Sequence, residues 1–278
     1  MNGPQSMLIN GETADAVTAC DRGLHYGDGV FETIAVKHGN MPFLNRHLSR
    51  LQAGCERLMI KPVDWDALAG EIKLLASEEE DCVIKSIITR GPGGRGYRPP
   101  ENAQPSRIVA RYPWRDIPQE WYREGVKLRF CNTQLARNPL LAGVKHLNRL
   151  EQIMARAEWS GDSYHEGIMC DESGNVIECT MMNIFFVKND QLMTPDLSRA
   201  GVAGIMRDVI LGLAAKLDIT HSVIGFKREQ LLEATELFVC NSVIGIWPVK
   251  AIEDQIFDIG PVTRRLQEEV TAIWNASA

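Results

Sequence analysis

Apolar and polar positions in the first part of the chain follow two periods, one typical of strands and one typical of helices. Residues 30–39 form a β-rich apolar run that ends at a Gly-Asn turn, which predicts a strand. Residues 43–60 carry apolar side chains at steps of three and four, which predicts an amphipathic helix. The side chains that set this period are Leu44, Leu48, Leu51, Cys55 and Leu58.

A second helix and two further strands are predicted after this pair. Asp64 is placed to cap a helix over residues 65–80. Residues 82–91 and 106–114 have the composition of strands, and they enclose a loop rich in glycine, proline and arginine.

The composition changes after this point and indicates a domain boundary. Residues 112–123 carry two prolines and many charges, which suits a long connection. We therefore expect a small N-terminal α/β domain over residues 1–114, an interdomain linker over residues 115–123 and a larger C-terminal domain over residues 124–278.

The larger predicted domain mixes strands and helices without regular alternation. Apolar runs predict strands at residues 126–135, 166–172, 175–190, 191–196 and 236–243. Helical periods predict helices near residues 147–159, 205–218 and 261–274. Because several strand-like runs follow one another directly, we predict an α+β fold with mixed, largely antiparallel sheets and flanking helices, rather than regular βαβ winding.

Composition and charge exclude several classes of function. The formal net charge of −6 over 278 residues argues against a nucleic-acid partner. We see no secretory signal and no apolar run long enough to cross a bilayer, so no membrane partner is expected. The seven cysteines lack a CxxC pair, which favours the reducing cytoplasm over a disulfide framework or a zinc site. The histidines show no ligand spacing, so no metal site is expected.

Lys145 is the first candidate for chemistry. It lies in LLAGVKHLNRLEQ, between an apolar run and a helix-like stretch. A desolvated lysine amine can lose its proton and attack a carbonyl to form an imine, the chemistry by which enzymes bind pyridoxal phosphate. An ordinary lysine with a packed stem and a solvated amine is the alternative.

Glu178 is the second candidate, because it stands in a run that is apolar on both faces. If residues 175–190 form one strand, Glu178 shares its face with Val176, Met182 and Ile184. A buried carboxylate needs a partner, and a protonated pyridine nitrogen would be one. A salt bridge to an arginine is the alternative.

Three glycine-containing segments have the character of anion sites. Gly201 and Gly204 precede the predicted helix at residues 205–218, whose first N–H groups can bind a phosphate; a plain glycine turn is the alternative. The segment CNSVIG offers the same two readings. The loop RGPGGRGYRPP lacks the ending of a P-loop. We interpret it as a mobile loop that presents guanidinium groups to a carboxylate substrate, with a solvated surface loop as the alternative.

Several of these segments together resemble a known family. The chain is similar to the fold-type IV pyridoxal phosphate enzymes, which include branched-chain and D-amino acid transaminases. The resemblance runs from about Leu8 to Val249. In chain order the matching segments are LHYGDGVFET, HLSRL, SIITRGPGGRGY, LAGVKHLNRLEQ, GNVIECTMMNIF, AGVAGIMR and CNSVIGIWPV. The resemblance implies two domains with the cofactor between them, in a homodimer.

The resemblance also assigns roles to individual residues. It implies that Lys145 binds the cofactor aldehyde, that Glu178 faces the pyridine nitrogen and that Arg50 contacts the phosphate. The remaining phosphate contacts would be the backbone N–H groups of Ile205 and Met206 and the hydroxyl of Ser242.

Within the family the chain most closely resembles the aminodeoxychorismate lyases of folate biosynthesis. The implied substrate is 4-amino-4-deoxychorismate, with Thr33 as a further catalytic group and with Tyr26, Arg95 and Tyr97 as substrate contacts. Leu150 stands where branched-chain transaminases usually have tyrosine, and Thr33 where they tend to have glycine. A branched-chain or D-amino acid transaminase is the alternative.

Overall fold

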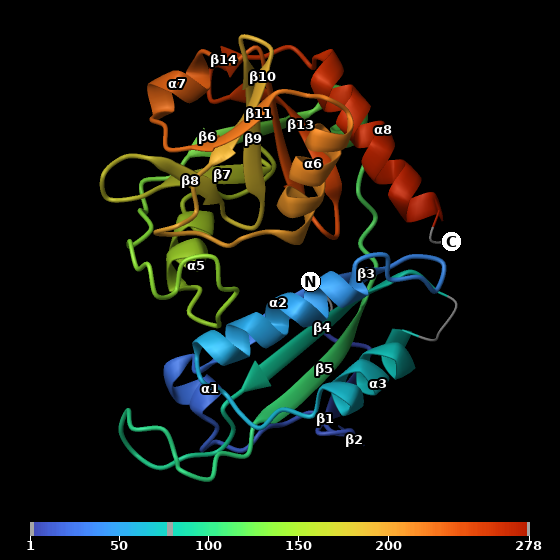
Figure 1. The fold of residues 1–278 in the computed structure, drawn as a ribbon, viewed down its shortest axis with the longest axis vertical. Helices are drawn as coiled ribbons and strands as arrows, with labels where there is room; N and C mark the ends of the chain where they lie inside the picture. Colours follow the sequence, from blue (N-terminus) through green and yellow to red (C-terminus); the bar gives the residue numbers. More distant parts are fainter. Residues whose placement is uncertain (1–2, 77–79, 277–278) are drawn as a thin grey trace. The chain divides into compact units, whose positions relative to one another are not determined.

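The chain is divided into two units in the structure, a computed structural model that describes residues 3–76 and 80–276 (Figure 1). The first unit contains the chain up to Arg115 and the segment Val144–Asn148. The second contains Asp116–Gly143 and Arg149–Asn275. The sequence assigns Lys145 to the C-terminal domain, whereas the structure groups it with the N-terminal unit. The reason is that residues 145–147 pair with a strand of that unit, as described below.

The first unit is built on a five-stranded antiparallel sheet. Its strand order is β2-β1-β5-β4-β3, and every neighbouring pair is antiparallel. The strands are β1 (Ser6–Ile9), β2 (Glu12–Thr13), β3 (Gly29–Val36), β4 (Cys82–Thr89) and β5 (Ser106–Pro113). The predicted strands at residues 30–39, 82–91 and 106–114 correspond to β3, β4 and β5. The sequence reading missed β1, whose four residues are too few to show a period.

Alternate residues of these strands form the core of the first unit. Val30, Ile34, Ile84 and Val109 point to one face of the sheet, where they pack against two helices. These helices are α2 (Leu44–Arg57), which contacts β3, and α3 (Trp65–Ala76), which contacts β4 and β5. The first was predicted from its apolar period and the second from the capping position of Asp64. The predicted continuation of the second helix through residues 77–79 lies outside the described residues.

The second unit is built on a nine-stranded mixed sheet. Its order is β11-β10-β9-β12-β13-β6-β7-β8, with β14 beside β13. The pairs β10–β11, β13–β6 and β6–β7 are parallel and the remaining pairs are antiparallel, so the predicted mixed, largely antiparallel arrangement is confirmed. The strands are β6 (Val126–Phe130), β7 (Glu166–Cys170), β8 (Val176–Cys179), β9 (Asn183–Lys188), β10 (Gln191–Pro195), β11 (His221–Ile224), β12 (Glu236–Asn241), β13 (Gly245–Ile252) and β14 (Gln255–Ile256).

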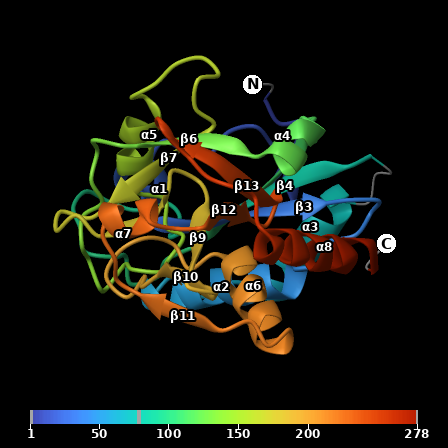
Figure 2. The ribbon, with the colours of Figure 1, turned by 90° about the horizontal axis from the view of Figure 1, so that it is seen from above.

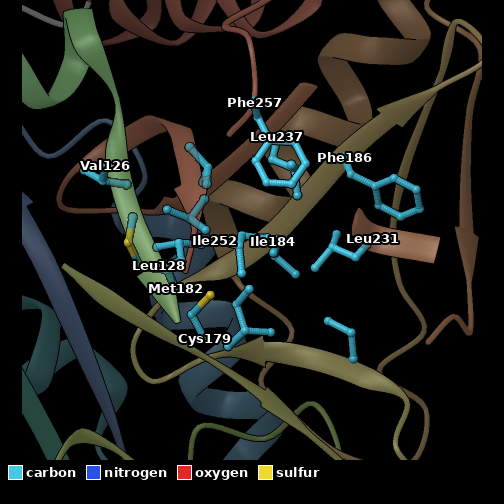
Figure 3. Packing of buried hydrophobic residues seen from close by; sticks show 14 of the residues in the cluster. Val126, Leu128, Cys179, Met182, Ile184, Phe186, Leu231, Leu237, Ile252 and Phe257 are labelled. Carbon is cyan, nitrogen blue, oxygen red and sulfur yellow. The ribbon is translucent and has the colours of Figure 1, made fainter. Parts of the chain in front are cut away.

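This sheet curls around its own apolar core. The end strand β8 comes back to contact β9 and β10, which lie towards the other end of the strand order. Figure 3 shows Leu128, Ile184, Leu237 and Ile252 pointing towards a common interior from four different strands. Because strands in this region are buried on both faces, their sequences read as continuous apolar runs rather than as alternating ones.

Five helices accompany the second sheet. They are α4 (Gln119–Glu124), α5 (Leu150–Arg156), α6 (Ile205–Lys216), α7 (Arg228–Leu232) and α8 (Pro261–Ala276). The two longest, α6 and α8, lie near each other in both views (Figures 1 and 2). The short helix α4 occupies most of the predicted linker and belongs to the second unit.

The predicted strand at residues 175–190 is broken in two. Residues 180–182 separate β8 from β9, because the carboxylate of Glu166 accepts hydrogen bonds from the backbone N–H groups of Thr180 (3.1 Å) and Met181 (2.9 Å). The Met181 N–H is thereby bound to a side chain, and the Thr180 N–H is shared between Glu166 and the Gly167 carbonyl of β7 (3.0 Å). Periodicity alone gives no sign of such a side-chain competitor.

Glu236 supplies a comparable local restraint at the start of α8. Its carboxylate accepts hydrogen bonds from the Thr263 N–H (2.8 Å), the Thr263 hydroxyl (2.8 Å) and the Val262 N–H (3.3 Å). A negative charge at a helix N-terminus is favourable because it satisfies N–H groups that have no partner within the helix. The carboxylate thus ties the closing helix to β12.

We predict that Glu236→Ala lowers the free energy of unfolding by roughly 2–3 kcal/mol, because it removes a cap and leaves the buried Thr263 hydroxyl without its acceptor. Urea denaturation measures this change. The matched control is Glu233→Ala, which removes a mostly exposed partner of Lys188 and should change stability by no more than about 0.5 kcal/mol. Equal losses in both variants would contradict the capping role.

Candidate active site

Lys145 is held beside β3 by backbone hydrogen bonds. The Phe31 N–H donates to the Lys145 carbonyl, and the Leu147 N–H donates to the Gly29 carbonyl, both at 3.0 Å. Residues 145–147 therefore extend the sheet edge and are not helical, so α5 begins later than the sequence predicts. A side chain at Gly29 would meet the Ile88 carbonyl and the Leu147 side chain, so glycine is required for this approach. The neighbouring Val144 is anchored in the core of the first unit.

The Lys145 amine lies over an aromatic ring. Its Nζ is 4.4 Å from the centroid of Phe31, which projects from β3 on the face away from α2 and α3. A second amine, Lys85 Nζ, lies 5.6 Å from the same centroid. Lys85 pairs in register with Thr33, so both share the face of Phe31. The sequence reading missed Lys85; its signal is a lysine among apolar residues at an alternating strand position.

Thr33 is thus brought onto the sheet face that carries Phe31 and the two amines. Its side chain is half-buried. A threonine at this position offers a hydroxyl that can donate or accept a proton. The structure therefore places the predicted pair of Lys145 and Thr33 in the first unit, on adjacent strand-like segments.

Arg50 is fixed by a buried carboxylate on the opposite face of β3. Its Nε and Nη2 donate to the two oxygens of Glu32, each at 2.7 Å, and His47 Nδ1 lies 2.6 Å from Glu32 Oε2. Burial alone would raise the pKa of Glu32, but the hydrogen bonds and charges of His47 and Arg50 outweigh it and hold the pKa at about 2. This bidentate pairing fixes the plane of the Arg50 guanidinium.

The glycine-rich loop at residues 91–98 is attached to α1 (Arg22–Tyr26). Arg90 does not face outwards, because it is buried and donates to both oxygens of Asp28 at 2.7 and 2.9 Å. Burial opposes ionisation of Asp28, yet hydrogen bonds from Arg90 and Arg22 leave its pKa lowered. Arg95 and Tyr97 are exposed, whereas Tyr26 is half-buried and accepts a hydrogen bond from the Gly96 N–H (3.2 Å). The predicted substrate contacts Tyr26, Arg95 and Tyr97 therefore lie on one connected element of the first unit.

Glu178 is buried on β8 in the second unit, as its apolar surroundings predict. Its Oε2 accepts a hydrogen bond from the Val202 N–H at 2.8 Å. Gly201 has a φ of +84°, and a side chain there would approach Glu178 Oε2 and Ile177. Arg149 lies within electrostatic reach: burial lowers its pKa and the negative charge of Glu178 opposes this effect. Since β8 ends at Cys179, the continuous alternation assumed for residues 175–190 does not apply beyond Glu178.

The predicted phosphate positions lie at the start of α6 and in the turn after β12. Gly204 is the N-cap of α6, and a side chain there would come within 1.9 Å of Asn183 Oδ1. Ile205 and Met206 are buried and have apolar side chains, so their backbone N–H groups are their only polar donors. The helix has no side-chain cap at its N-cap. Ser242 is half-buried in a turn that Asn241 closes by accepting the N–H groups of Val243 and Ile244.

Glu166 is a second buried carboxylate of this unit that the sequence reading did not single out. Burial raises its pKa, while hydrogen bonds from Thr180, Gly167 and Met181 act in the opposite direction. It shapes the bend between β8 and β9 next to Glu178. No short motif marks it, because two of its hydrogen-bond partners, Thr180 and Met181, follow it by 14 and 15 residues in the chain.

Within residues 3–76 and 80–276 the structure contains neither a candidate metal site nor a candidate membrane span. No group of three His, Cys, Asp or Glu side chains in these ranges could hold a metal ion. The helices of this described part include none with the length and apolar character needed to cross a membrane.

The cluster of Glu32, His47 and Arg50 generates a pH prediction. Because the pKa of Glu32 is about 2 in the folded chain and 4.5 ordinarily, its stabilising contribution is complete above 4.5 and is lost as the pH falls towards 2. This contribution is on the order of 3 kcal/mol. Glu32→Gln should therefore flatten the fall in unfolding free energy over this pH window, as measured by urea titrations at successive pH values. Glu101→Gln, at an exposed ion pair with Arg98, should keep the wild-type profile, and the same profile in both variants would refute the prediction.

Comparison with known proteins identifies the fold and the family. The sequence profile of amino-transferase class IV matches residues 29–252. The chain is 37% identical over 263 residues to an aminodeoxychorismate lyase of Vibrio harveyi, an alignment that covers 93% of this chain and 97% of the relative.

Two solved structures extend this comparison. The 4-amino-4-deoxychorismate lyase from Pseudomonas aeruginosa superimposes with a TM-score of 0.92 at 44% identity, covering 96% of this chain and 98% of that one. The branched-chain amino acid aminotransferase of Escherichia coli gives a TM-score of 0.85 at 26% identity, with coverage of 97% and 94%. The predicted fold-type IV resemblance is thereby confirmed, and the chain belongs to the class IV aminotransferase family.

Proposed function

We propose that this chain is a pyridoxal phosphate-dependent lyase that converts 4-amino-4-deoxychorismate to 4-aminobenzoate and pyruvate, a step of folate biosynthesis. The observation that carries the proposal is the difference in similarity within the family. Lyases reach 37% and 44% identity over nearly the full chain, whereas the aminotransferase compared above reaches 26%. Leu150 adds support, because its exposed aliphatic side chain begins α5 where branched-chain transaminases usually have tyrosine.

The residues in the two units suit a phosphorylated pyridine aldehyde. Lys145 offers an amine for the aldehyde, and Glu178 offers a carboxylate shielded from solvent for the ring nitrogen. Arg50 offers a guanidinium of fixed orientation for the phosphate. The N-terminus of α6 adds the N–H groups of Ile205 and Met206, after a glycine on which a side chain would meet Asn183. Ser242 adds a hydroxyl.

Pyridoxal phosphate supplies an electron sink when bound, since its protonated ring accepts the electron pair left by a departing proton. Lys145 is the base that takes this proton from the substrate carbon bearing the amine. The ring of Phe31 favours the ammonium that Lys145 becomes, by about 0.5–1 kcal/mol. The carboxylate of Glu178 keeps the pyridine nitrogen protonated, because an ionised partner favours the charged form.

Loss of the enolpyruvyl group from the substrate completes the reaction. Enolpyruvate departs from the carbon next to the one that lost its proton, and the six-membered carbon ring of the substrate becomes aromatic. The departing group needs a proton to become pyruvate, which the Lys145 ammonium or the Thr33 hydroxyl donates. Both groups belong to the same face of the first unit. Tyr26, Arg95 and Tyr97 contact the substrate, with the Arg95 fork matching a carboxylate.

We further propose a homodimer in the reducing cytoplasm. The sheet face of the first unit opposite α2 and α3 carries half-buried apolar side chains. These side chains are Met7, Ile9, Val83, Ile87, Ile108 and Tyr112. A partner subunit would remove such a face from water. All seven cysteines are free, which suits a reducing compartment.

The purified protein, incubated with 4-amino-4-deoxychorismate, should release pyruvate and 4-aminobenzoate in equal amounts without a keto-acid co-substrate. Lys145→Ala should lower turnover by about 10²–10⁴-fold or more, because one amine both binds the cofactor and transfers the proton. It should also abolish the visible absorbance of the bound cofactor. Lys73→Ala, on the exposed side of α3, is the control that should match the wild type. A need for 2-oxoglutarate, with no 4-aminobenzoate formed, would establish a transaminase instead.

Glu178→Gln should keep cofactor bound but slow turnover by at least about tenfold, or about 1.4 kcal/mol of barrier, because a neutral amide no longer favours the protonated ring. Cofactor occupancy is followed by absorbance and turnover by pyruvate release. Glu172→Gln, a more exposed residue beside the same hairpin, is the control and should have no effect. An unchanged rate at full occupancy in Glu178→Gln would make Glu178 a purely structural carboxylate.

A further inference from the structure

The loop at residues 91–98 is pinned in a way that its composition does not suggest. Glycines at positions 91, 93, 94 and 96 give it much freedom in the unfolded chain, so fixing it costs entropy. The sequence accordingly predicts a mobile loop. In the structure the Arg22 N–H donates to the Gly91 carbonyl (3.0 Å) and the Gly93 N–H donates to the Cys20 carbonyl (3.1 Å). The start of the loop is therefore bound to the residues around α1.

The far end of the loop is held by the side chain of Arg22. Its Nη1 donates to the Gly96 carbonyl (2.9 Å) and its Nη2 to the Tyr97 carbonyl (3.3 Å), while Nε donates to Asp28 (2.9 Å). Arg22 is 4% exposed, although arginine is seldom buried unless it is paired. One guanidinium thus uses all three nitrogens to join two successive loop carbonyls to a carboxylate at the start of β3.

Two further contacts set the shape of the loop at residues 91–98. A side chain on Gly93 would come within 2.7 Å of Arg22 Cδ, so the loop lies directly on the arginine stem. Tyr26 packs under the Arg22 guanidinium at 4.8 Å, and its ring meets that of Tyr97 at 5.6 Å. The carbonyls beside Arg95 are turned inwards to Arg22, while the Arg95 side chain is exposed.

We propose that Arg22 is a positioning residue for substrate recognition: it preorganises the glycine-rich loop so that Arg95 and Tyr97 meet the carboxylate-bearing substrate without a further ordering cost. The inference rests on the proposed function, because it gives the loop the substrate contacts assigned there. Preorganisation raises affinity by removing the entropy lost when a flexible loop is immobilised on binding. Arg22 itself touches the loop backbone and acts through Arg95.

The first test compares Michaelis constants. Arg22→Lys keeps a positive charge beside Asp28 but has no planar fork for the two carbonyls. It should raise the KM for 4-amino-4-deoxychorismate by about tenfold, the effect of losing hydrogen bonds that order a binding loop. The kcat and the dissociation constant of pyridoxal phosphate should stay within about twofold of the wild type. Arg98→Lys, an exposed position on the same loop paired with Glu101, is the matched control and should change none of these three constants.

The second test asks whether Arg22 acts through Arg95. Arg95→Lys should itself raise KM, and the double variant should then have nearly the KM of Arg95→Lys alone, because residues that act as one unit are not additive. A residue that affected substrate binding independently of Arg95 would multiply the two effects. Multiplied effects, or an unchanged KM in Arg22→Lys, would overturn the proposal.

The third test reports on the loop without any turnover. Trypsin can cleave the exposed Arg95–Gly96 bond, whereas the proline after Arg98 protects that bond, so the rate of nicking at Arg95 measures how often the loop opens. Arg22→Lys should increase this rate at least about threefold at unchanged global stability. If that variant does not fold, Gly93→Ala displaces the arginine stem while keeping its charge and should show the same increase. An unchanged nicking rate in a folded variant refutes the pinning.

Failure of this inference is distinct from failure of the proposed function. A wild-type protein that forms no pyruvate and 4-aminobenzoate removes the lyase assignment, whatever Arg22 does. A wild type that forms both products, with an unchanged KM in Arg22→Lys, removes only the role of Arg22.

Discussion

The pairing of residues 145–147 with β3 is the interaction on which the arrangement of the first unit's candidate groups depends. Two backbone hydrogen bonds place Lys145 beside Phe31, and the missing side chain of Gly29 permits the approach. Successive residues of β3 point to opposite faces. Phe31 and Thr33 therefore share the face of the lysine amine, while Glu32 points to α2 and orients Arg50. The groups proposed for proton transfer and the arginine proposed for anion binding are thus placed by neighbouring residues of one strand.

Buried and half-buried carboxylates fix the positions of other groups in both units. Glu32 orients one arginine and a histidine, Asp28 joins Arg22 to Arg90, and Glu166 breaks a strand by binding two backbone N–H groups. A buried charge is tolerated only when its hydrogen-bonding capacity is satisfied, so each of these groups fixes the positions of several others. The candidate site consequently depends on second partners that do not themselves face a ligand. Arg22 is the clearest case, since it reaches the loop backbone on one side and Asp28 on the other.

The sequence was sufficient for the elements that have a period and insufficient for those set by single contacts. The helix predicted at residues 43–60 and the strands at residues 82–91 and 106–114 appear as α2, β4 and β5, because a face buried in one core imposes its repeat on the chain. Residues 145–147 are extended, but a segment of three residues is too short to show an apolar period, so the sequence pattern could not predict its conformation. Arg90 and Arg95 look equivalent in the loop sequence, but Arg90 is buried by partners distant in the chain, Asp28 and the carbonyls of Leu58 and Met59, whereas Arg95 is exposed.

The same reasoning explains why one fold can support both a lyase and a transaminase. Both reactions start when a base removes the proton from the carbon bearing the amine, so the roles proposed for Lys145 and Glu178 suit either. The reactions diverge at the next step, where a lyase needs a leaving group on the adjacent carbon and a proton donor for it, and a transaminase needs the proton returned to the cofactor. Thr33 places a hydroxyl on the face of Lys145, and the loop held by Arg22 carries Arg95, whose proposed role is to bind a carboxylate. On this proposal, reaction choice depends on groups around Lys145 on the first unit's sheet, whereas the roles proposed for Lys145 and Glu178 are common to both reactions.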